Sequence, residues 1–561
     1  MDDRKLQGLL VTDFTDEVLV NYLNNGEGLP ALEVHAAGFD QVMPVLMSPE
    51  DPSRRQKDFV FVWARPEKLF DAFRRFLELE SVSFEEILDE VDRFCGLLKH
   101  WDEGGTSVFV ASWMLPPDQH KINILQDMKT RHGLSYCLMR MNTRLIENVS
   151  GFRSVHVLNA GAWAQHVGRN AFNYKLWYMS KVPFDPLVFK EAAQDIKAAL
   201  RGIRGLTRKL ILLDLDDTLW GGIVGEDGWE NLCLGGHDPL GEAFVDFQHA
   251  LKRLKRQGVL LGIVSKNEES VALEAIRRHP EMVLKEEDFT GWKINWDDKA
   301  KNITELAAEL NLGLQSVVFI DDNPLERARV REALPEILVP EWPQDKMLSR
   351  KTLQSLACFD SPSVTAEDLK RSEMYAQERN RKDALAQIGS PEDWLKSLKI
   401  KVNVAPLSKT NLARTAQLLN KTNQMNLSTR RMTEAELLAW AEHPSRKLWT
   451  FRVMDKFGDS GLTGIASLET NGSTARIIDF VLSCRVFGRK IEDLMFYVLY
   501  AHAQKCRVKE LQAKYLPTPK NKPCLEFLRR LELKEREPHV FTWDMNQGCG
   551  APQLLTMESE D

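Results

Sequence analysis

The apolar run KLILLDL at 209–215, which leads directly into the acidic residues DDT, constrains the fold of this chain more than any other feature. A continuous apolar run bounded by polar residues is typical of a strand that is buried on both faces. Two similar runs follow, VLLGIVS at 259–265 and SVVFIDD at 316–322, with amphipathic helical patterns between them. Because strands that alternate with helices build parallel sheets, the middle of the chain is predicted to be an α/β domain.

The same alternation marks the N-terminal region, whereas the order of elements changes towards the C-terminus. Short apolar runs at 9–11, 59–63, 107–113 and 154–158 are separated by helix-like stretches, which predicts a second parallel α/β sheet. Beyond 399, three successive strand-like runs separated by turn signals predict an antiparallel meander, and the tail QGCGAPQLLTMESED reads as frayed. We therefore predict two α/β domains, 1–205 and 206–345, followed by a helical connector, 346–398, and a C-terminal α+β domain, 399–561.

Composition excludes several classes of protein. Among 561 residues, 43% are hydrophobic and 28% are charged, as in folded globular domains, and the net charge of −7 argues against a non-specific nucleic-acid binder. No run approaches the roughly 18 apolar residues of a membrane span, and the N-terminus lacks a signal-peptide pattern. The eight cysteines are scattered without CxxC pairs, which favours reduced thiols in a cytoplasm. We therefore expect a cytoplasmic protein, and from its charge and the lack of an apolar span we expect it to bind neither nucleic acid nor membranes.

The strongest chemical signal lies at the ends of the predicted central strands. Asp214, Asp216 and Asp217 follow the first strand, and Asp321 and Asp322 follow the third. Ligands of parallel α/β sheets bind at the carboxyl ends of the strands, so these carboxylates are expected to lie together. Since clustered carboxylates repel one another without a cation, the sequence predicts a Mg²⁺ site with Asp214, Asp216, Asp321 and Asp322 as its ligands.

Two further residues in this domain suit a phosphoryl group. The second strand ends in Ser265, whose hydroxyl and following backbone amides can bind phosphate oxygens, and Lys299 precedes a helix and offers a positive charge. Lys266 and Lys293 are alternative lysines for that charge. The short intervals from Asp214 to Ser265 and from Ser265 to Lys299 leave no room for a large inserted cap domain. The site is therefore expected either to accept a bulky substrate or to be closed by a neighbouring domain or partner.

This ordered set resembles the haloacid dehalogenase superfamily of aspartyl phosphatases and phosphotransferases, whose central domain is Rossmann-like. The resemblance implies that Asp214 is the nucleophile that forms an aspartyl phosphate and that Asp216 is the general acid and base. It further implies that Asp321 or Asp322 anchors Mg²⁺, while Ser265 and Lys299 stabilise the phosphoryl group. A carboxylate is a recognised covalent nucleophile, and a metal ion with a lysine offsets the charge that develops in transfer.

Longer motifs narrow the resemblance to the FkbH-like family, over nearly the whole chain. These are WGGIVGEDGWENLCLG, INWDDK and FIDDNPLER in the central domain, with LPALEVHAAGFDQV, LWYMSKVPF, LNKTNQMNLSTRR and SCRVFGRKIE outside it. Characterised members dephosphorylate D-1,3-bisphosphoglycerate and carry its glyceryl group on an enzyme cysteine. They then load the group as a thioester onto the phosphopantetheine of an acyl carrier protein, for polyketide biosynthesis. Two rival hypotheses are a phosphatase or N-acyltransferase acting on sugars or amines, and a scaffold with vestigial sites.

The C-terminal domain resembles the GNAT acyltransferase fold, an α+β fold in which a strand-to-helix loop holds the phosphates of coenzyme A or of a pantetheine arm. That loop corresponds to CRVFGRK at 484–490, so the predicted phosphopantetheine-binding residues are Arg485, Gly488, Arg489 and Lys490. Cys484 lies beside Arg485 and before a helix, where a thiol pKa is lowered, and is the predicted glyceryl-carrying thiol. Cys233 is the alternative, whereas Cys506 and Cys524 are predicted to be core residues.

The N-terminal domain resembles the SGNH-hydrolase fold without its catalytic pattern. A nucleophilic serine is expected after the first strand, but Thr12 and Asp13 stand there, and Asn159 and His166 occur where a DxxH pair is expected. A threonine and an aspartate at a strand end more often cap a helix. We therefore predict a degenerate, non-hydrolytic domain that shapes the site or docks the carrier.

Overall fold

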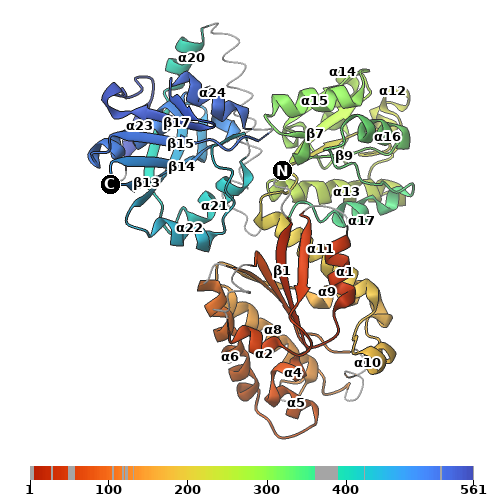
Figure 1. Cartoon of the computed structure of the whole chain (residues 1–561). Coiled ribbons are helices and arrows are strands. Elements are labelled where there is room, and N and C mark those ends of the chain that lie inside the picture. Colours follow the sequence, from red (N-terminus) through yellow and green to blue (C-terminus); the bar gives the residue numbers. More distant parts are fainter. Residues whose placement is uncertain are drawn as a thin grey trace. The chain divides into compact units, whose positions relative to one another are not determined.

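The structure of the chain, a computed structural model, has three β-sheets in the residues that it describes (Figure 1). The chain divides into two compact units, Met1–Arg201 with Met432–Ala439, and Gly202–Arg431 with Trp440–Asp561. The predicted multi-domain α/β architecture is confirmed, whereas the domain boundaries stay predictions. The described residues are 5–26, 30–48, 57–103, 106–116, 119, 124–130, 132–360, 390–422, 424–518 and 521–559.

The N-terminal sheet has five parallel strands in the order β2-β1-β3-β4-β5. Every residue of β3 and β4 is buried, as expected for central strands covered on both faces, while β2 lies at the sheet edge and alternates between buried and exposed residues. That alternation contains no apolar run, which is why β2 was not predicted. The strands are β1 (Leu6–Thr12), β2 (Leu32–Ala36), β3 (Phe59–Trp63), β4 (Ser107–Ala111) and β5 (Val155–Leu158).

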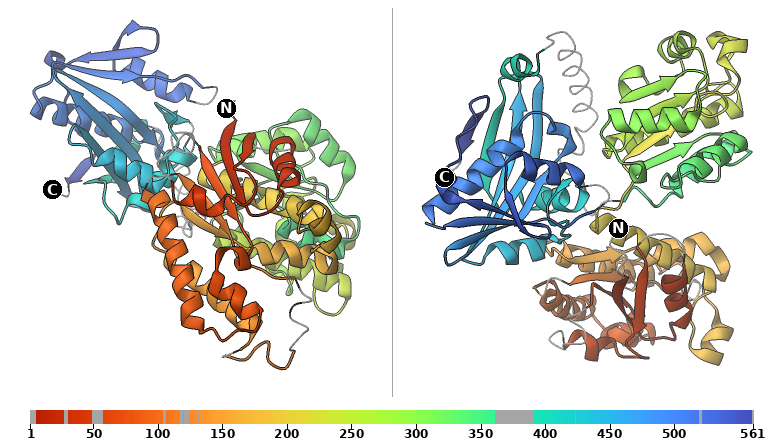
Figure 2. Two further views of the ribbon diagram at one scale, coloured as in Figure 1. Left: turned by 60° about the horizontal axis from the view of Figure 1, so that its bottom comes forward. Right: turned by 45° about the horizontal axis from the view of Figure 1, so that its top comes forward.

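Helices cover both faces of this sheet, as the views in Figure 2 show. They include α1 (Glu17–Asn25), α6 (Phe84–Glu103), α8 (Leu134–Val149), α9 (Ala160–Val167) and α11 (Pro186–Ile203). Aromatic side chains pack next to the carboxyl ends of β1 and β3: the Trp63 ring stacks on Phe184 with centroids 4.9 Å apart and meets Trp163 at 5.0 Å. Buried aromatic rings therefore fill space at the sheet edge where α/β folds commonly bind ligands.

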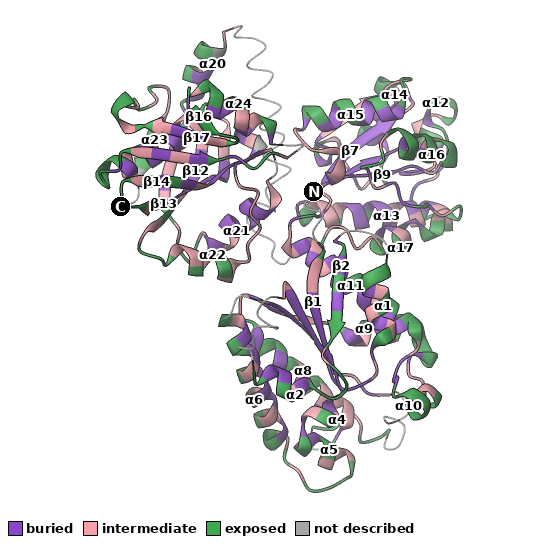
Figure 3. Cartoon of the chain, viewed as in Figure 1, coloured by how far each residue is buried: buried purple, intermediate pink, exposed green. Residues whose placement is uncertain are grey.

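The central sheet has four parallel strands in the order β8-β7-β6-β9. Successive residues of β6 contribute to two cores: Ile211 and Leu213 to one face of the sheet, and Leu210 and Leu212 to the other. This two-sided burial, visible as buried strands in Figure 3, explains the continuous apolar run in the sequence. The strands are β6 (Leu210–Leu213), β7 (Leu260–Ser265), β8 (Gly291–Ile294) and β9 (Val317–Ile320).

Helices and turns connect these strands. Between β6 and β7 lie the four-residue helix α12 (Val224–Asp227), a 3₁₀ turn and the long helix α13 (Pro239–Arg256). Asp238 caps α13 by accepting a hydrogen bond from the Gly241 N–H at 3.0 Å, and Gly258 follows the helix with φ +93°. The remaining helices are α14 (Glu269–Arg278), α15 (Lys299–Glu309) and α16 (Pro324–Ala333), so neither interval within the predicted site contains a large inserted domain.

The C-terminal sheet has nine strands among the described residues. Strands β12 (Arg446–Asp455), β13 (Gly458–Asn471) and β14 (Thr474–Leu482) form the predicted antiparallel meander, and β15 (Glu510–Lys514) pairs parallel with β14. Helix α23 (Ile491–Lys505) connects β14 to β15, and α24 (Lys522–Arg530) follows. The other strands are β10 (Lys401–Pro406), β11 (Met425–Asn426), β16 (Lys534–Glu537), β17 (Val540–Asp544) and β18 (Thr556–Ser559).

The tail corrects one expectation. Its residues Thr556–Ser559 are not frayed but form β18, which pairs parallel with β10 and begins with a hydrogen bond from the Thr556 N–H to the Ile400 carbonyl at 3.0 Å. In the predicted connector, α17 (Ser349–Gln354) and α20 (Pro391–Leu398) are helical, while 361–389 lie outside the described residues. Within the described part of the chain, none of the helices has the length and apolarity that crossing a membrane requires.

Candidate active site

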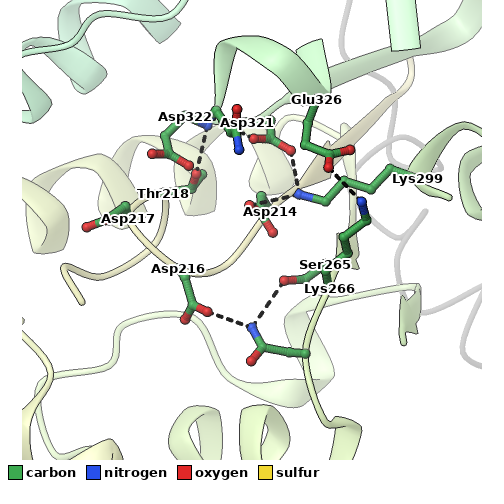
Figure 4. Close-up of polar contacts among 12 residues, drawn as sticks. Asp214, Asp216, Asp217, Thr218, Ser265, Lys266, Lys299, Asp321, Asp322 and Glu326 are labelled. Atoms are coloured by element: carbon green, nitrogen blue, oxygen red, sulfur yellow. Dashed lines mark hydrogen bonds and ion pairs between the residues drawn. The ribbon is translucent and has the colours of Figure 1, made fainter. Parts of the chain in front are cut away.

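Four polar side chains meet at the carboxyl edge of the central sheet (Figure 4). Asp214 directly follows β6, Ser265 ends β7, Lys299 begins α15 after β8, and Asp321 directly follows β9. The Asp214 N–H donates to the carbonyl of Ile320 at 3.0 Å, which extends the pairing of β6 with β9 up to the two acidic residues. Parallel pairing therefore brings together residues that are distant in the sequence.

Lys299 lies between two buried carboxylates. Its Nζ is 2.9 Å from Asp214 Oδ2 and 2.6 Å from Asp321 Oδ2, and its side chain is 4% exposed. Burial raises the pKa of Asp214, although the nearby ammonium opposes this, and burial and the Asp214 charge raise the pKa of Asp321 to about 6. Burial alone would lower the pKa of Lys299, but the two carboxylates outweigh it and raise that pKa.

The site also has the donor atoms of a metal centre. One oxygen each of Asp214, Asp321 and Asp322 lie within 4.8 Å of one another. Asp214 Oδ1 is buried and has no hydrogen-bond partner, an arrangement that is costly unless another group satisfies the oxygen. Carboxylate oxygens are the ligands that Mg²⁺ prefers, so these residues fit a Mg²⁺ ion.

Asp216, the predicted general acid and base, is held by three hydrogen bonds. Its Oδ1 accepts from Trp220 Nε1 at 2.9 Å and from the Val224 N–H at 3.0 Å, and its Oδ2 accepts from Asn267 Nδ2 at 2.8 Å. The same Asn267 amide lies 3.4 Å from the Ser265 hydroxyl. Asp216 is not one of the three carboxylates within metal-binding distance, so the prediction that it binds Mg²⁺ gains no support from the geometry.

Of the three candidate lysines, Lys299 alone contacts the acidic cluster. Lys266 Nζ is bound to Glu326 at 2.6 Å, and Lys293 Nζ is bound to Glu309 at 2.7 Å. Sequence reasoning missed a different lysine, Lys346, whose Nζ donates to the Asp217 carbonyl at 2.7 Å and to Asp322 Oδ2 at 2.8 Å. Lys346 falls in the predicted connector, where no pattern links it to the site.

The predicted phosphopantetheine loop is organised by an internal ion pair. Arg489 is 1% exposed, and its guanidinium donates to Asp455 Oδ2 at 3.1 Å and to the Arg485 carbonyl at 2.6 Å. Gly488 and Lys490 have positive φ of 75° and 57°, so the chain turns sharply before α23. Arg485, Gly488 and Lys490 are at least partly exposed, whereas Arg489 is used to hold the loop together.

The first turn of α23 carries acidic residues that weaken its attraction for an anion. Glu492 and Asp493 accept hydrogen bonds from Arg530 at 3.0 and 2.7 Å. Negative side chains at a helix N-terminus already interact with its dipole and compete with a bound phosphate. Phosphate binding by this loop therefore stays a prediction.

A buried ion pair holds the LNKTNQMNLSTRR segment against β14. The Arg430 guanidinium donates from Nε to Asp479 Oδ1 at 3.0 Å and from Nη2 to Oδ2 at 2.6 Å. Asp479 is fully buried and also accepts from the hydroxyls of Ser428 and Ser467. This bidentate pair fixes the position of β11 beside β14 and explains why these polar residues cluster in one motif.

The described cysteines differ in their surroundings. Cys233 donates its S–H to Asp238 Oδ2 at 3.0 Å, and burial and that carboxylate raise its pKa to about 11. Cys524 is buried as predicted, but Cys506 is exposed, so its placement in the core was wrong. Cys506 follows the last turn of α23, beyond the apolar face of the helix, and its Sγ lies 3.5 Å from His502 Nε2. The side chain of Cys484 lies outside the described residues.

These surroundings predict which thiols react with iodoacetamide. At pH 7.5, a pKa of about 11 leaves only about 0.03% of Cys233 as thiolate, the reactive form, so Cys233 is expected to alkylate slowly and faster as the pH rises towards 11. The exposed Cys506 should alkylate first and the buried Cys524 only after unfolding. Mass spectrometry of peptides from the native protein measures each rate. Alkylation of Cys233 as fast as that of Cys506 at pH 7.5 would contradict the assignment.

In the N-terminal domain, the residues at the positions where a hydrolase would carry its catalytic groups bind nearby residues instead. The Thr12 hydroxyl donates to the Phe14 carbonyl at 2.8 Å, and buried Asp13 binds Arg65 Nε at 2.7 Å. Asn159 caps α9 by accepting from the Ala162 N–H at 3.3 Å, and His166 Nδ1 lies 3.2 Å from Glu191. These contacts agree with a structural use of the four residues, and the lack of hydrolase activity stays a prediction.

Comparison with known structures finds similarity to a protein that contains a phosphatase domain. A crystal structure of the N-terminal part of the protein BF1531 from Bacteroides fragilis, which contains a phosphatase domain and is complexed with Mg, is similar to this chain. The two are 28% identical, with a TM-score of 0.58, over 65% of this chain and 96% of that one. No protein-family model matches the chain, and no curated protein matches it.

Weaker similarities involve acetyltransferases. The ribosomal-protein-S18-alanine N-acetyltransferase from Escherichia coli is 9% identical with a TM-score of 0.21, over 26% of this chain and 94% of its own. An acetyltransferase from Trypanosoma brucei is 17% identical with a TM-score of 0.19, over 24% of this chain and 94% of its own. Similarity at this level supports no inference about activity, so the acyltransferase role depends on the sequence resemblance.

Proposed function

We propose that the central domain is a Mg²⁺-dependent phosphatase that acts through an aspartyl phosphate on Asp214. The observation that carries this proposal is the buried Asp214 carboxylate at the end of β6, with Lys299 Nζ 2.9 Å from one oxygen and no partner for the other. The similarity to a phosphatase domain complexed with Mg, at 28% identity, supports it further. Asp214, Asp321 and Asp322 are the proposed Mg²⁺ ligands.

The first chemical step is transfer of the phosphoryl group to the enzyme. An Asp214 oxygen attacks phosphorus, the bond from phosphorus to the leaving oxygen breaks, and Asp216 gives that oxygen a proton. The Lys299 ammonium and the Ser265 hydroxyl stabilise the phosphoryl oxygens. Asp214, Asp321 and Asp322 would hold Mg²⁺, whose positive charge would offset the repulsion between the phosphoryl group and Asp214.

The second step regenerates the enzyme. Asp216 takes a proton from a water molecule whose oxygen attacks phosphorus, the bond between Asp214 and phosphorus breaks, and inorganic phosphate leaves. A carboxyl group has about four hydrogen-bonding positions, and Asp216 uses three of them. Two of these bonds are to Oδ1 and one, from Asn267, is to Oδ2, so Oδ2 has a position left for the leaving oxygen or the water.

We further propose that the full chain transfers a glyceryl group from D-1,3-bisphosphoglycerate to the phosphopantetheine thiol of an acyl carrier protein. In the acyl transfer, a thiolate attacks the carbonyl carbon of the acyl phosphate, a C–S bond forms, and phosphate leaves with the C–O electron pair. The phosphatase site removes the other phosphate, either from the donor before this transfer or from the enzyme-bound phosphoglyceryl group after it. This proposal depends on the FkbH-like motifs and on the loop at 484–490.

Intact-protein mass spectrometry of the carrier tests this transfer. Enzyme, Mg²⁺, donor and holo-carrier together are expected to give a glyceryl adduct on the holo-carrier and none on the apo-carrier. Cys484→Ala should abolish the enzyme-bound intermediate, whereas Cys233→Ala should retain it, because the raised pKa of Cys233 disfavours its thiolate. Phosphate release without any adduct would instead favour a phosphatase that acts without a carrier.

A further inference from the structure

Lys346 lies next to the acidic cluster although it comes from a separate segment. It begins a short 3₁₀ turn, Lys346–Leu348, whose preceding residue Asp345 accepts a hydrogen bond from the Met347 N–H at 3.0 Å. The Lys346 side chain is 19% exposed and reaches from there to two loops of the site. Its Nζ donates to Asp322 Oδ2 at 2.8 Å and to the Asp217 carbonyl at 2.7 Å.

These two bonds join the loop after β6 to the loop after β9. Asp217 has a φ of 51°, a left-handed conformation that an aspartate adopts at some cost, and its carbonyl is one of the two groups bound by Lys346. The Asp322 N–H donates to the Thr218 hydroxyl at 3.2 Å, which is a second link between the same loops. Lys346 is therefore placed to fix the separation of Asp322 from Asp214.

The contact also orients the Asp322 carboxylate. Lys346 donates to Asp322 Oδ2, and among the described residues no hydrogen bond is found to Asp322 Oδ1. The same holds for Asp214 Oδ1. Asp214 and Asp322 can therefore each offer an oxygen to a cation. One oxygen of each of them lies within 4.8 Å of an oxygen of Asp321. Groups that hydrogen-bond a metal-binding side chain orient it, and their loss typically weakens metal binding by roughly 10–100-fold.

We propose that Lys346 is a positioning residue that holds Asp322 in the orientation required for Mg²⁺ binding. The inference rests on the proposed Mg²⁺ site and adds a residue that the sequence motifs do not contain. Two physical effects of Lys346 have opposite signs. As a positive charge it repels Mg²⁺, so removing it would tighten binding, whereas as an orienting donor it favours Mg²⁺, so removing it would weaken binding. The two bonds made by its Nζ indicate that the second effect is larger.

Isothermal titration of Mg²⁺ into the full-length protein separates these effects without any measurement of activity. Lys346→Met is expected to raise the Kd for Mg²⁺ by about 10–100-fold, and Lys346→Arg, which keeps the charge and can still donate, should recover part of that loss. Lys293→Met is the matched control, because Lys293 pairs with Glu309 and Glu305 away from the acidic cluster. That control should bind Mg²⁺ as the wild type does.

A double-mutant cycle with Asp322→Asn tests whether Lys346 acts through Asp322. In that background, Lys346→Met should change the Kd by less than about threefold, since the oriented carboxylate is already gone. Unchanged or tighter Mg²⁺ binding by Lys346→Met with wild-type Asp322 overturns the inference and leaves the metal site intact. Absence of Mg²⁺ binding by the wild type overturns the proposed metal site and the inference together. Circular dichroism of each variant before titration confirms that it is folded.

Discussion

Asp214→Asn is expected to reduce phosphate release by at least about 10³-fold, because the amide cannot attack phosphorus to form the aspartyl phosphate. The change keeps the size of the side chain, and Asp214 Oδ2 lies 2.9 Å from Lys299 Nζ, a contact that the amide oxygen of asparagine can also make. The loss is therefore expected in the rate and not in folding. Phosphate release from an acyl phosphate and from a phosphate monoester, each with saturating Mg²⁺, measures it.

Asp246→Asn is the matched control for this change. Asp246 lies on α13, pairs with Arg350 and is 47% exposed, so its loss should alter stability by no more than about 1 kcal/mol and leave phosphate release unchanged. Phosphate release by Asp214→Asn within tenfold of the wild-type rate would show that another group is the nucleophile. Mass spectrometry after rapid acid quenching provides a second readout, since the aspartyl phosphate adds a phosphoryl group to the peptide that contains Asp214.

Lys299→Met is expected to lower the free energy of unfolding of the metal-free protein by about 3–5 kcal/mol. The change removes the cation between Asp214 and Asp321 and leaves two buried carboxylates facing each other. Such a loss exceeds that of an exposed pair because water cannot replace the missing charge at a side chain that is 4% exposed. Urea unfolding with a chelator present measures it, and phosphate release should fall as well.

Two further variants test whether this loss of stability comes from the buried carboxylates. Lys293→Met, which breaks an ion pair with Glu309 at a partly exposed side chain, should cost no more than about 1 kcal/mol. In Lys299→Met combined with Asp214→Asn, one of the two facing charges is gone, so part of the stability should return. Equal losses for Lys299→Met and Lys293→Met would mean that the buried carboxylates do not depend on Lys299 for their stability.

The core of the site could be predicted because each of its residues is adjacent to a strand. Asp214, Ser265 and Asp321 stand at the ends of apolar runs, and Lys299 begins the helix that follows another strand. In a parallel sheet such positions converge at one edge, so local patterns sufficed to bring them together. The choice of Lys299 over Lys266 and Lys293 needed the structure, because all three are close to strand ends and only side-chain reach separates them.

Other parts of the molecule have no local signal. Strand β2 alternates between buried and exposed residues at a sheet edge, and β18 forms by pairing with β10, which begins far earlier in the chain. The Arg430 side chain finds its partner Asp479 on a different strand. Each depends on contacts between distant segments, which hydrophobic periodicity does not report.

By itself, the sequence determined the parallel α/β sheets and the acidic strand ends, because buried strands require continuous apolar runs and parallel strands end at the same edge. Only the tertiary structure decided which charges meet there. It placed Lys299 between Asp214 and Asp321, turned Asp216 towards Trp220 and Asn267, and brought Lys346 to Asp322. The physical reason is that burial and hydrogen bonding depend on distances in space, and segments without a periodic pattern are positioned only when the domain packs.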